Sequence, residues 1–184
     1  MPDPSAPSFL ARSAVRVAPA LLGKCLVRRR GRRLLVLPIH EVEAYHGPHD
    51  RASHASRGPT PRNRPMFGPA GCWYVYLVYG MHWMLNVTTA EEGVPSAVLI
   101  RGAGGIVGPG RLTRALGLDG TFSGKPATRA SGLWLEDRGI RVPRRHVRRT
   151  PRIGVTYAGP TWAGRPWRFT VDPARVVESA GRAR

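Results

Sequence analysis

The sequence predicts a single domain of the α/β class, of the α+β type, in which a few short helices accompany antiparallel β-hairpins. A length of 184 residues suits one domain, and a hydrophobic fraction of 42% is enough for one core. Segments rich in β-branched and aromatic residues alternate with turns that contain glycine, which is typical of hairpins. The domain is expected to span residues 10–175, between a flexible tail at 1–9 and a frayed tail at 176–184.

Periodicity and turn residues place the individual elements. Apolar residues at helical spacing before Gly23 predict a short helix, because glycine favours the position after a helix end. Two arms that meet at residues 79–80 predict a hairpin, and Leu112, Ala115 and Leu116 share one face of a second helix. The expected elements are, in chain order, a helix over 12–22, hairpin arms over 24–29 and 34–45, a hairpin over 72–86, a strand over 94–101, a helix over 111–118 and closing strands over 153–157 and 166–171.

The segment 47–71 is polar, rich in Gly and Pro, and too long for an ordinary connection inside a small domain. Long ordered loops usually carry function, so this segment is a candidate part of the site. Four histidines lie in or near it, at His40, His46, His49 and His54. Their spacing matches no helical pair and no cysteine joins them, so we expect single hydrogen-bonding partners or surface residues and no metal site.

The chain is strongly basic. Lys and Arg number 29 against 11 Asp and Glu, which gives a formal charge of +18, and the sequence pI is near 11.6. Such a charge indicates a polyanionic partner, and nucleic acid is the leading candidate. Lys24 and Lys125 are the only lysines, but a GC-rich genome would also favour arginine, so the identity of the basic residue carries little weight.

Cysteine usage and the N-terminus bear on the compartment. Cys25 and Cys72 form neither a disulfide framework nor a zinc ribbon, which favours a reducing cytoplasm. The N-terminus, with Asp3 and three early prolines, lacks the blocks of a signal peptide. No apolar run is long enough to span a bilayer, so no membrane association is expected.

Two acidic residues lie on an apolar strand. Alternate residues of a strand share a face, so Glu41, Glu43 and Tyr45 are expected on one side while Val42 and Ala44 pack on the other. The pattern alone fits a solvated strand edge and a catalytic pair about equally well. Hydrolysis of a glycosidic bond needs a carboxylate that deprotonates water and stabilises positive charge on the sugar, and Glu43 suits that chemistry.

Aromatic residues concentrate in the hairpin over 72–86. Trp73 is expected in the core, but a hairpin tip cannot be buried by its own sheet, so Tyr79 is a candidate wedge. Enzymes that act on one base of a duplex extrude it and hold it in a pocket. The planar side chains available near the candidate carboxylate are Tyr45, His54 and Tyr76.

With these residues in view, the chain resembles the methylpurine-DNA glycosylase family, the 3-methyladenine excision enzymes of the mammalian alkyladenine type. The resemblance runs in family order from about residue 17 to residue 171, which is nearly the whole chain. The segments that carry it are EVEAY at 41–45, TPRNRPMF at 60–67, YVYLVYGM at 74–81, VLIR at 98–101, GPGRL at 108–112 and PRIGV at 151–155.

The resemblance implies a role for each candidate residue. Glu43 would be the general base that activates water, helped by the Arg101 side chain and the Ile153 backbone carbonyl. Tyr79 would intercalate in the minor groove, and Asn86 would exclude guanine by clashing with its exocyclic amine. The stacking pocket would be formed by Tyr45, His54 and Tyr76.

The resemblance also implies the fold, substrate and product. It implies a curved antiparallel sheet with peripheral helices and a protruding hairpin that inserts into DNA. The substrate would be double-stranded DNA containing a damaged purine, alkylated or deaminated, and the product an abasic site. The enzyme would be a monofunctional glycosylase and a monomer, in a bacterial-type cytoplasm and associated with the nucleoid through DNA. No metal or organic cofactor is expected, and no lysine lies near the site for a lyase step.

Four positions are candidates for contacts with the DNA backbone. Arg62 and Arg64 carry guanidinium groups within the family segment at 60–67. The helix that follows the glycine-rich turn presents backbone N–H groups at Gly110 and Arg111, which suit a phosphate. Such turns are common, so this signal alone is weak.

One segment departs from the family pattern. After Arg101 the family continues with an acidic Glu-Pro segment and a longer loop, whereas this chain passes through residues 102–107 directly to Gly108. The footprint on DNA and the substrate range are therefore open. The basic run 144–152 either compensates by holding phosphate or is a solvated charge run.

Two other classes of protein compete with the glycosylase. Charge and aromatic residues alone also fit a catalytically silent nucleic-acid binder, such as one for RNA. A structural protein of a ribosome-like assembly would leave the acidic strand and Tyr79 unexplained. Release of a free purine from methylated DNA separates the enzyme from both.

Overall fold

The computed structural model describes residues 7–176, and its strands form one nine-stranded sheet. The order is β3-β4-β5-β2-β1-β7, with β6 beside β5 and a β8–β9 ribbon beside β2, and every pairing among these strands is antiparallel. The strands are β1 (Cys25–Arg30), β2 (Arg33–His46), β3 (Trp73–Val78), β4 (His82–Thr88), β5 (Ser96–Ala103), β6 (Ile106–Val107), β7 (Leu133–Glu136), β8 (Arg148–Thr150) and β9 (Arg168–Thr170).

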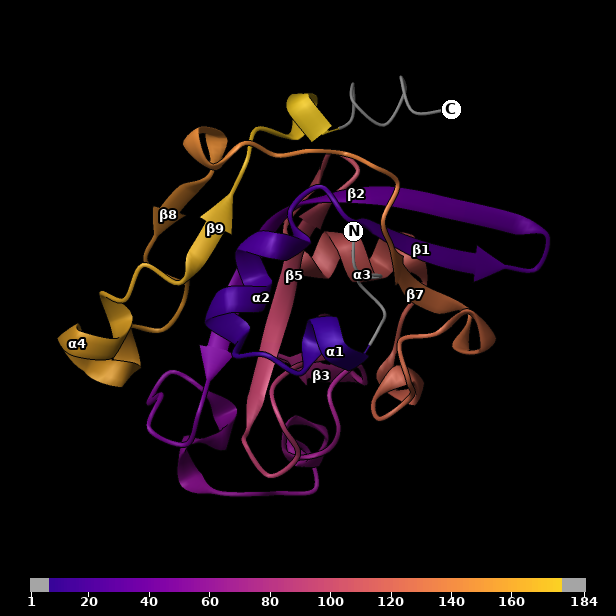
Figure 1. Ribbon diagram of the computed structural model, residues 1–184. Coiled ribbons are helices and arrows are strands. Elements are labelled where there is room, and N and C mark those ends of the chain that lie inside the picture. The colour runs from indigo at the N-terminus through magenta and orange to yellow at the C-terminus, as the bar shows by residue number, and fades with distance from the viewer. Residues whose placement is uncertain (1–6, 177–184) are drawn as a thin grey trace.

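Strand β2 connects the two halves of the sheet. Its first part pairs with β1 up to Pro38, and its last part pairs with β5 from Ile39 to His46 and with β9 on the opposite edge. Register shifts on either side of Glu41 mark an irregularity of the bulge type, which bends a strand and increases its twist. The sheet curls around this bend (Figure 1), so the predicted α+β domain with a curved antiparallel sheet is confirmed.

Helices and short turns surround the sheet. The α-helices are α1 (Pro7–Leu10), α2 (Ala14–Leu21), α3 (Pro109–Leu116) and α4 (Gly159–Ala163), and 3-10 turns lie at His54–Arg57, Arg64–Phe67, Gly120–Phe122, Arg129–Ser131, Arg144–His146 and Thr156–Ala158. None of the helices formed by residues 7–176 has the length and hydropathy of a membrane span.

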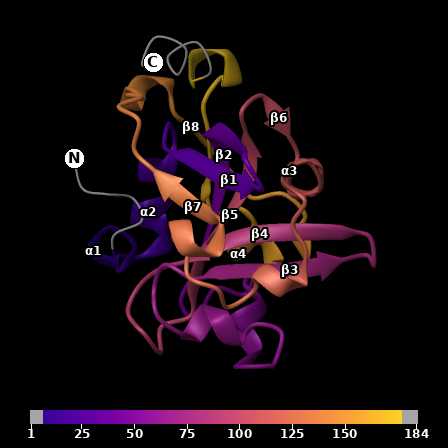
Figure 2. The same cartoon turned by 90° about the vertical axis from the view of Figure 1, so that its right-hand side faces the viewer.

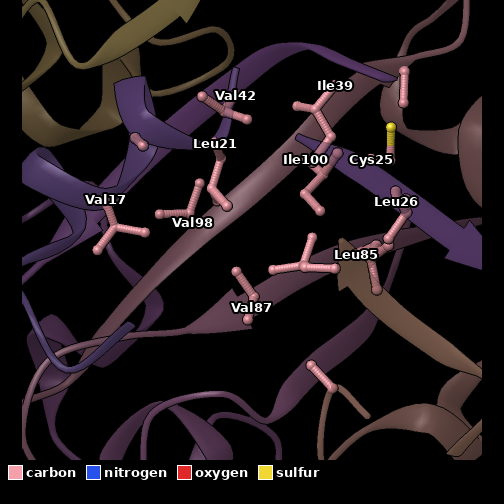
Figure 3. Close-up of a cluster of buried hydrophobic side chains, with 14 of the residues drawn as sticks. Val17, Leu21, Cys25, Leu26, Ile39, Val42, Leu85, Val87, Val98 and Ile100 are labelled. Carbon is pink, nitrogen blue, oxygen red and sulfur yellow. The ribbon is translucent and has the colours of Figure 1, made fainter. Parts of the chain in front are cut away.

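One continuous core joins helix α2 to the sheet. Val17 and Leu21 point from α2 toward Val42 of β2 and Val98 of β5 (Figure 3), and all four side chains are fully buried. Trp73 of β3 is also fully buried, as predicted, and its indole Nε1 donates to the Leu133 carbonyl at 3.0 Å. Burial of this apolar surface is the main stabilising contribution to the fold.

The β3–β4 hairpin projects from the body of the domain, which confirms the predicted protrusion (Figure 2). Its arms pair from Trp73 with Val87 out to Val78 with His82, and residues 79–81 connect them. Helix α3 braces β4 near the hairpin tip, where the Thr113 hydroxyl donates to the Trp83 carbonyl at 2.8 Å. The hairpin tip is thereby held away from the core.

Both predicted tails are too long. Pro7–Leu10 forms α1 and buries Phe9 and Leu10, so the tail predicted at 1–9 is wrong for its last three residues. Val176, predicted to fray, is buried in the core as well. Apolar burial orders these positions, and the remainder of each tail, 1–6 and 177–184, lies outside the described residues.

The closing part of the chain differs most from the prediction. Residues 153–157 form a bend and the start of a 3-10 turn instead of a strand, and β9 pairs with β8, which lies inside the basic run, as well as with β2. Strand β7, which pairs with β1, was not predicted. In α3, Ala115 faces solvent while Thr113 is buried with Leu112 and Leu116.

A buried ion pair joins the loop after β2 to the segment after β8. The two terminal guanidinium nitrogens of Arg152, Nη1 and Nη2, donate to the Asp50 carboxylate at 2.6 and 2.8 Å, and neither side chain is exposed. Arg152 also donates to the Ala44 carbonyl of β2 at 2.9 Å, and its guanidinium lies 4.7 Å from the centre of the Tyr45 ring. Arg152, the last residue of the basic run 144–152, therefore has a buried side chain that links β2 to the loop containing Asp50.

We predict that Arg152→Ala lowers the free energy of unfolding by about 3–5 kcal/mol, because it leaves the Asp50 carboxylate buried without a countercharge. Urea denaturation measures the loss. Arg129→Ala is the control, since Arg129 is 72% exposed where it pairs with Glu136, and it should cost no more than about 1 kcal/mol. Equal losses in the two variants would contradict the prediction.

Candidate active site

Strand β2 presents its two carboxylates on the face opposite the core. Val42 and Ala44 are buried in the hydrophobic core, as the alternation predicted. Glu41 and Glu43 lie on the other face, yet both are buried, at 5% and 0% exposure. The solvated-edge interpretation is therefore wrong, because partners from other segments cover this edge.

Glu43 is held by three groups, one from its own strand and two from distant parts of the chain. The Tyr45 hydroxyl donates to Oε2 at 2.9 Å, and the Ile153 backbone N–H donates to Oε1 at 2.8 Å. Arg101 Nε lies 3.4 Å from the same Oε1. An ionised carboxylate has about four acceptor positions, so this arrangement orients the group and leaves acceptor capacity on it.

Arg101 is held in turn by Glu41. Its Nε donates to Glu41 Oε1 at 2.9 Å, and Arg168 Nε donates to the same oxygen at 2.7 Å. Glu41 therefore balances two guanidinium groups and positions Arg101 next to Glu43. The sequence singled out Glu41 but assigned it no role, and it did not single out Arg168.

The two carboxylates have opposite pKa shifts. Burial raises the pKa of Glu43, and the charge of Arg101 and the hydrogen bonds from Ile153 and Tyr45 offset only part of this effect. Burial also acts on Glu41, but hydrogen bonds from Arg168 and Arg101 outweigh it and hold the pKa of Glu41 below its ordinary value. Carboxylates whose environments separate their pKa values in this way are typical of acid–base sites.

A cavity of about 350 Å³ opens in front of Glu43, within the size range of small-ligand sites. Glu43 itself does not line it, but its three partners Tyr45, Arg101 and Ile153 do. The carboxylate therefore lies directly behind the cavity wall. The structure brings to this wall the predicted residues Tyr45, His54, Tyr76, Tyr79, Asn86, Arg101 and Ile153.

Aromatic rings form one side of the cavity. The His54 and Tyr76 rings meet edge to face with centroids 4.6 Å apart, and His54 Nδ1 lies 3.0 Å from the Tyr74 hydroxyl. Burial, together with the nearby charge of Arg62, lowers the pKa of His54, so its ring is neutral at pH 7. Burial raises the pKa of Tyr76 well above neutrality. The wall is therefore aromatic and uncharged.

Asn86 lies on β4 in the floor of this cavity. Its side chain is nearly fully buried, at 3% exposure, and its Nδ2 donates to the Tyr74 carbonyl at 3.0 Å across the hairpin. The hydrogen bond locks the amide orientation. A bulky, immobile group therefore restricts what fits against this part of the wall.

Tyr79 stands at the tip of the hairpin. It is 88% exposed, and its neighbour Met81 is 67% exposed. Tyr79 has a φ of 53°, in the left-handed region that a non-glycine residue rarely adopts, and Gly80 follows at 69°. Outliers of this kind cluster at functional positions. Because Tyr79 also borders the cavity, the tip and the cavity form one surface.

The four candidates for backbone contacts do not line the cavity. Arg62 and Arg64 are both exposed, and Arg62 donates to the Leu77 carbonyl at 2.8 Å with its guanidinium over the Tyr76 ring. Arg111 is exposed on α3. A Cβ on Gly110 would come within 3.0 Å of the His82 ring, so Gly110 permits close packing of α3 on the hairpin.

The side chains of two other histidines each have one hydrogen-bonding partner. His40 Nε2 contacts the Ile106 carbonyl at 3.1 Å, and His46 Nδ1 contacts the Ser96 hydroxyl at 2.9 Å. Within residues 7–176, no group of three or more His, Cys, Asp or Glu side chains is placed to hold a metal ion. These histidines therefore belong to the packing of β2 and its neighbours.

Sequence reasoning missed several residues that shape the site. Tyr74 is buried and supports His54, and Asp50 with Arg152 places Ile153, the next residue along the chain, against Glu43. Asp50 is the one acidic residue between positions 47 and 71. An isolated carboxylate in a long basic loop was a signal that could have indicated a buried partner.

Comparison with known proteins is consistent with this geometry. The model of the family described as "Methylpurine-DNA glycosylase (MPG)" matches residues 8–107 and 102–175. Relatives named "Putative 3-methyladenine DNA glycosylase" occur in Anaeromyxobacter dehalogenans strain 2CP-C and Myxococcus xanthus. The first is 49% identical over 171 residues, which cover 89% of this chain and 81% of the relative. The second is 47% identical over 179 residues, covering 92% and 91%.

A plant relative extends the comparison. The "DNA-3-methyladenine glycosylase" of Arabidopsis thaliana is 40% identical over 185 residues, which cover 90% of this chain and 70% of the relative. The family match spans nearly all of the described residues, including every residue of the site. The chain therefore belongs to the methylpurine-DNA glycosylase family, and its prediction as a monofunctional DNA glycosylase, a hydrolase of N-glycosyl bonds, is confirmed.

Proposed function

We propose that this protein removes alkylated purines, 3-methyladenine in particular, after flipping them out of double-stranded DNA, and that it leaves an abasic site. The observation that carries the proposal is the position of Glu43, a buried carboxylate whose three partners all line an aromatic cavity. The names of the relatives give the substrate class.

In the proposed reaction, Glu43 orients a water molecule and accepts its proton. The water oxygen bonds to the anomeric carbon of the extruded nucleotide, while the electrons of the N-glycosidic bond leave with the base. The Glu43 anion also stabilises the positive charge that develops on the sugar. Arg101 and the Ile153 carbonyl are proposed to help hold the water.

The aromatic wall supports the choice of an alkylated base. Tyr45, His54 and Tyr76 are proposed to stack on the flipped purine, and a neutral π-face attracts a cationic base. A cationic purine is also a good leaving group, because it departs neutral. A deaminated base such as hypoxanthine lacks both advantages, so we propose it as a slower substrate.

The protruding hairpin supports the mode of DNA binding. Tyr79 is proposed to enter the minor groove and fill the space left by the extruded nucleotide. Arg62, Arg64 and the N–H groups at Gly110 and Arg111 are proposed to contact backbone phosphates. The protein is further proposed to act as a monomer in the cytoplasm, bound to the nucleoid through DNA.

Glu43→Gln should lower the single-turnover rate of base release from methylated duplex DNA by at least about a hundredfold, the usual contribution of a general base. Because the pKa of Glu43 is raised, the wild-type rate should rise as pH increases through a value above the ordinary glutamate range and should level off once the group is ionised. Glu92→Gln, at an exposed position, is the matched control. A Glu43→Gln variant with the wild-type rate would contradict the proposed role of Glu43 as the general base.

Tyr79→Ala should weaken flipping while leaving the cavity intact. Loss of stacking by the inserted ring should cost about 1–3 kcal/mol, a fivefold to more than hundredfold change in the flipping equilibrium. Fluorescence of a base analogue at the lesion site measures the extruded fraction. Tyr79→Phe should retain most of it, and an unchanged signal in Tyr79→Ala would refute the wedge.

Asn86→Ser should relax discrimination against guanine-derived bases. The smaller side chain removes the amide that stands where an exocyclic amine would lie. We expect the release of 7-methylguanine to increase severalfold relative to that of 3-methyladenine, measured by chromatography of bases freed from methylated DNA. A constant ratio would show that another group sets the selectivity.

A further inference from the structure

A second hollow adjoins the proposed base cavity and has no role in the reaction described above. Its volume is about 760 Å³, and its lining includes Arg51, Ser53, Ser56 and Arg57. Ser53, His54 and Tyr157 line both this hollow and the base cavity. The two hollows are therefore neighbours, separated by side chains that belong to both.

Tyr157 forms a rigid part of this boundary. Its side chain is 68% exposed, yet its hydroxyl donates to the Ala52 carbonyl at 2.9 Å. The bond fixes the ring between the two hollows. Anything that extends from the base cavity past Tyr157 therefore enters a space bordered by Arg51 and Arg57.

The charge of this second hollow is not neutralised within the described residues. Arg51 and Arg57 are exposed, and residues 7–176 provide neither of them with a hydrogen bond, ion pair or ring contact. Asp50, the nearest acidic residue in sequence, is turned inward and bound by Arg152. Two guanidinium groups thus border a polar hollow without a countercharge.

We propose that the second hollow binds a phosphodiester of the damaged strand next to the flipped nucleotide, through Arg51 and Arg57. The proposal rests on the proposed function, because a flipped nucleotide must occupy the neighbouring cavity. Its phosphates are joined to it through one sugar, so they stay at the cavity mouth. Guanidinium groups bind phosphate in a bidentate manner, and the serine hydroxyls offer additional donors.

The double variant Arg51→Ala/Arg57→Ala tests this site. The probe is a duplex with a tetrahydrofuran abasic analogue, which the enzyme cannot cleave, and anisotropy gives its affinity over a salt series. Each lost phosphate contact should reduce the slope of log K against log salt by about 0.9. We expect the slope of the double variant to fall by the amount that corresponds to one or two lost phosphate contacts. Its melting temperature should be unchanged, because both side chains are exposed.

Arg32→Ala/Arg33→Ala is the matched control. These two exposed arginines lie in the turn before β2 and at its first residue, whereas the hollow follows the other end of this 14-residue strand. Removing the same charge there should leave the slope near the wild-type value. Equal slopes in the two double variants, or a wild-type slope in Arg51→Ala/Arg57→Ala, would overturn the proposal.

Neutral methylphosphonate linkages locate the contact. Replacing one phosphate beside the abasic analogue should weaken wild-type binding, and the same replacement should have no further effect on Arg51→Ala/Arg57→Ala. Additive losses at every position would overturn the site. Failure of the proposed function is distinguishable, since it would appear as absent base release by the wild type on methylated duplex, whatever the binding result.

Discussion

The bidentate contact between Arg152 and Asp50 determines where the groups of the candidate active site lie. It connects the loop after β2 with the segment after β8, and through the Ala44 carbonyl it also holds β2. Because Ile153 follows Arg152 directly, this contact places the Ile153 N–H against Glu43. A buried ion pair contributes little net stability compared with apolar packing, but breaking it is costly. In this protein the ion pair matters because it permits only one arrangement of these segments around Glu43.

Charge is distributed unevenly in this protein, and the distribution suits its partner. Acidic residues are few, and Glu41, Glu43 and Asp50 lie inside the protein, each against at least one arginine. Some arginines on the outside pair with Glu136 or Asp137, but Arg51 and Arg57 have no carboxylate partner within the described residues. The outer surface is therefore more positive than a uniform distribution would make it, which favours binding to a polyanion.

The site depends on elements that cannot adjust independently. The aromatic wall combines Tyr45 from β2, His54 from the following loop and Tyr76 from β3, and the hairpin that carries Tyr76 also carries Asn86 and Tyr79. Tyr79 at the tip and the cavity residues Tyr76 and Asn86 are held in fixed relative positions by the cross-strand hydrogen bonds of one hairpin. Such rigidity is what the proposed coupling of insertion to extrusion requires.

Local pattern determined the hairpins, the alternation on β2 and the exposed tip at Tyr79, because strand period and turn chemistry act over a few residues. Family resemblance supplied the roles proposed for Glu43 and its neighbours. Tertiary structure decided the rest. The segment predicted as a strand at 153–157 forms a bend because Arg152 and Ile153 contact Asp50 and Glu43, which are more than 100 residues away in sequence. The pKa of Glu43 is raised only because several distant segments exclude water from its carboxylate.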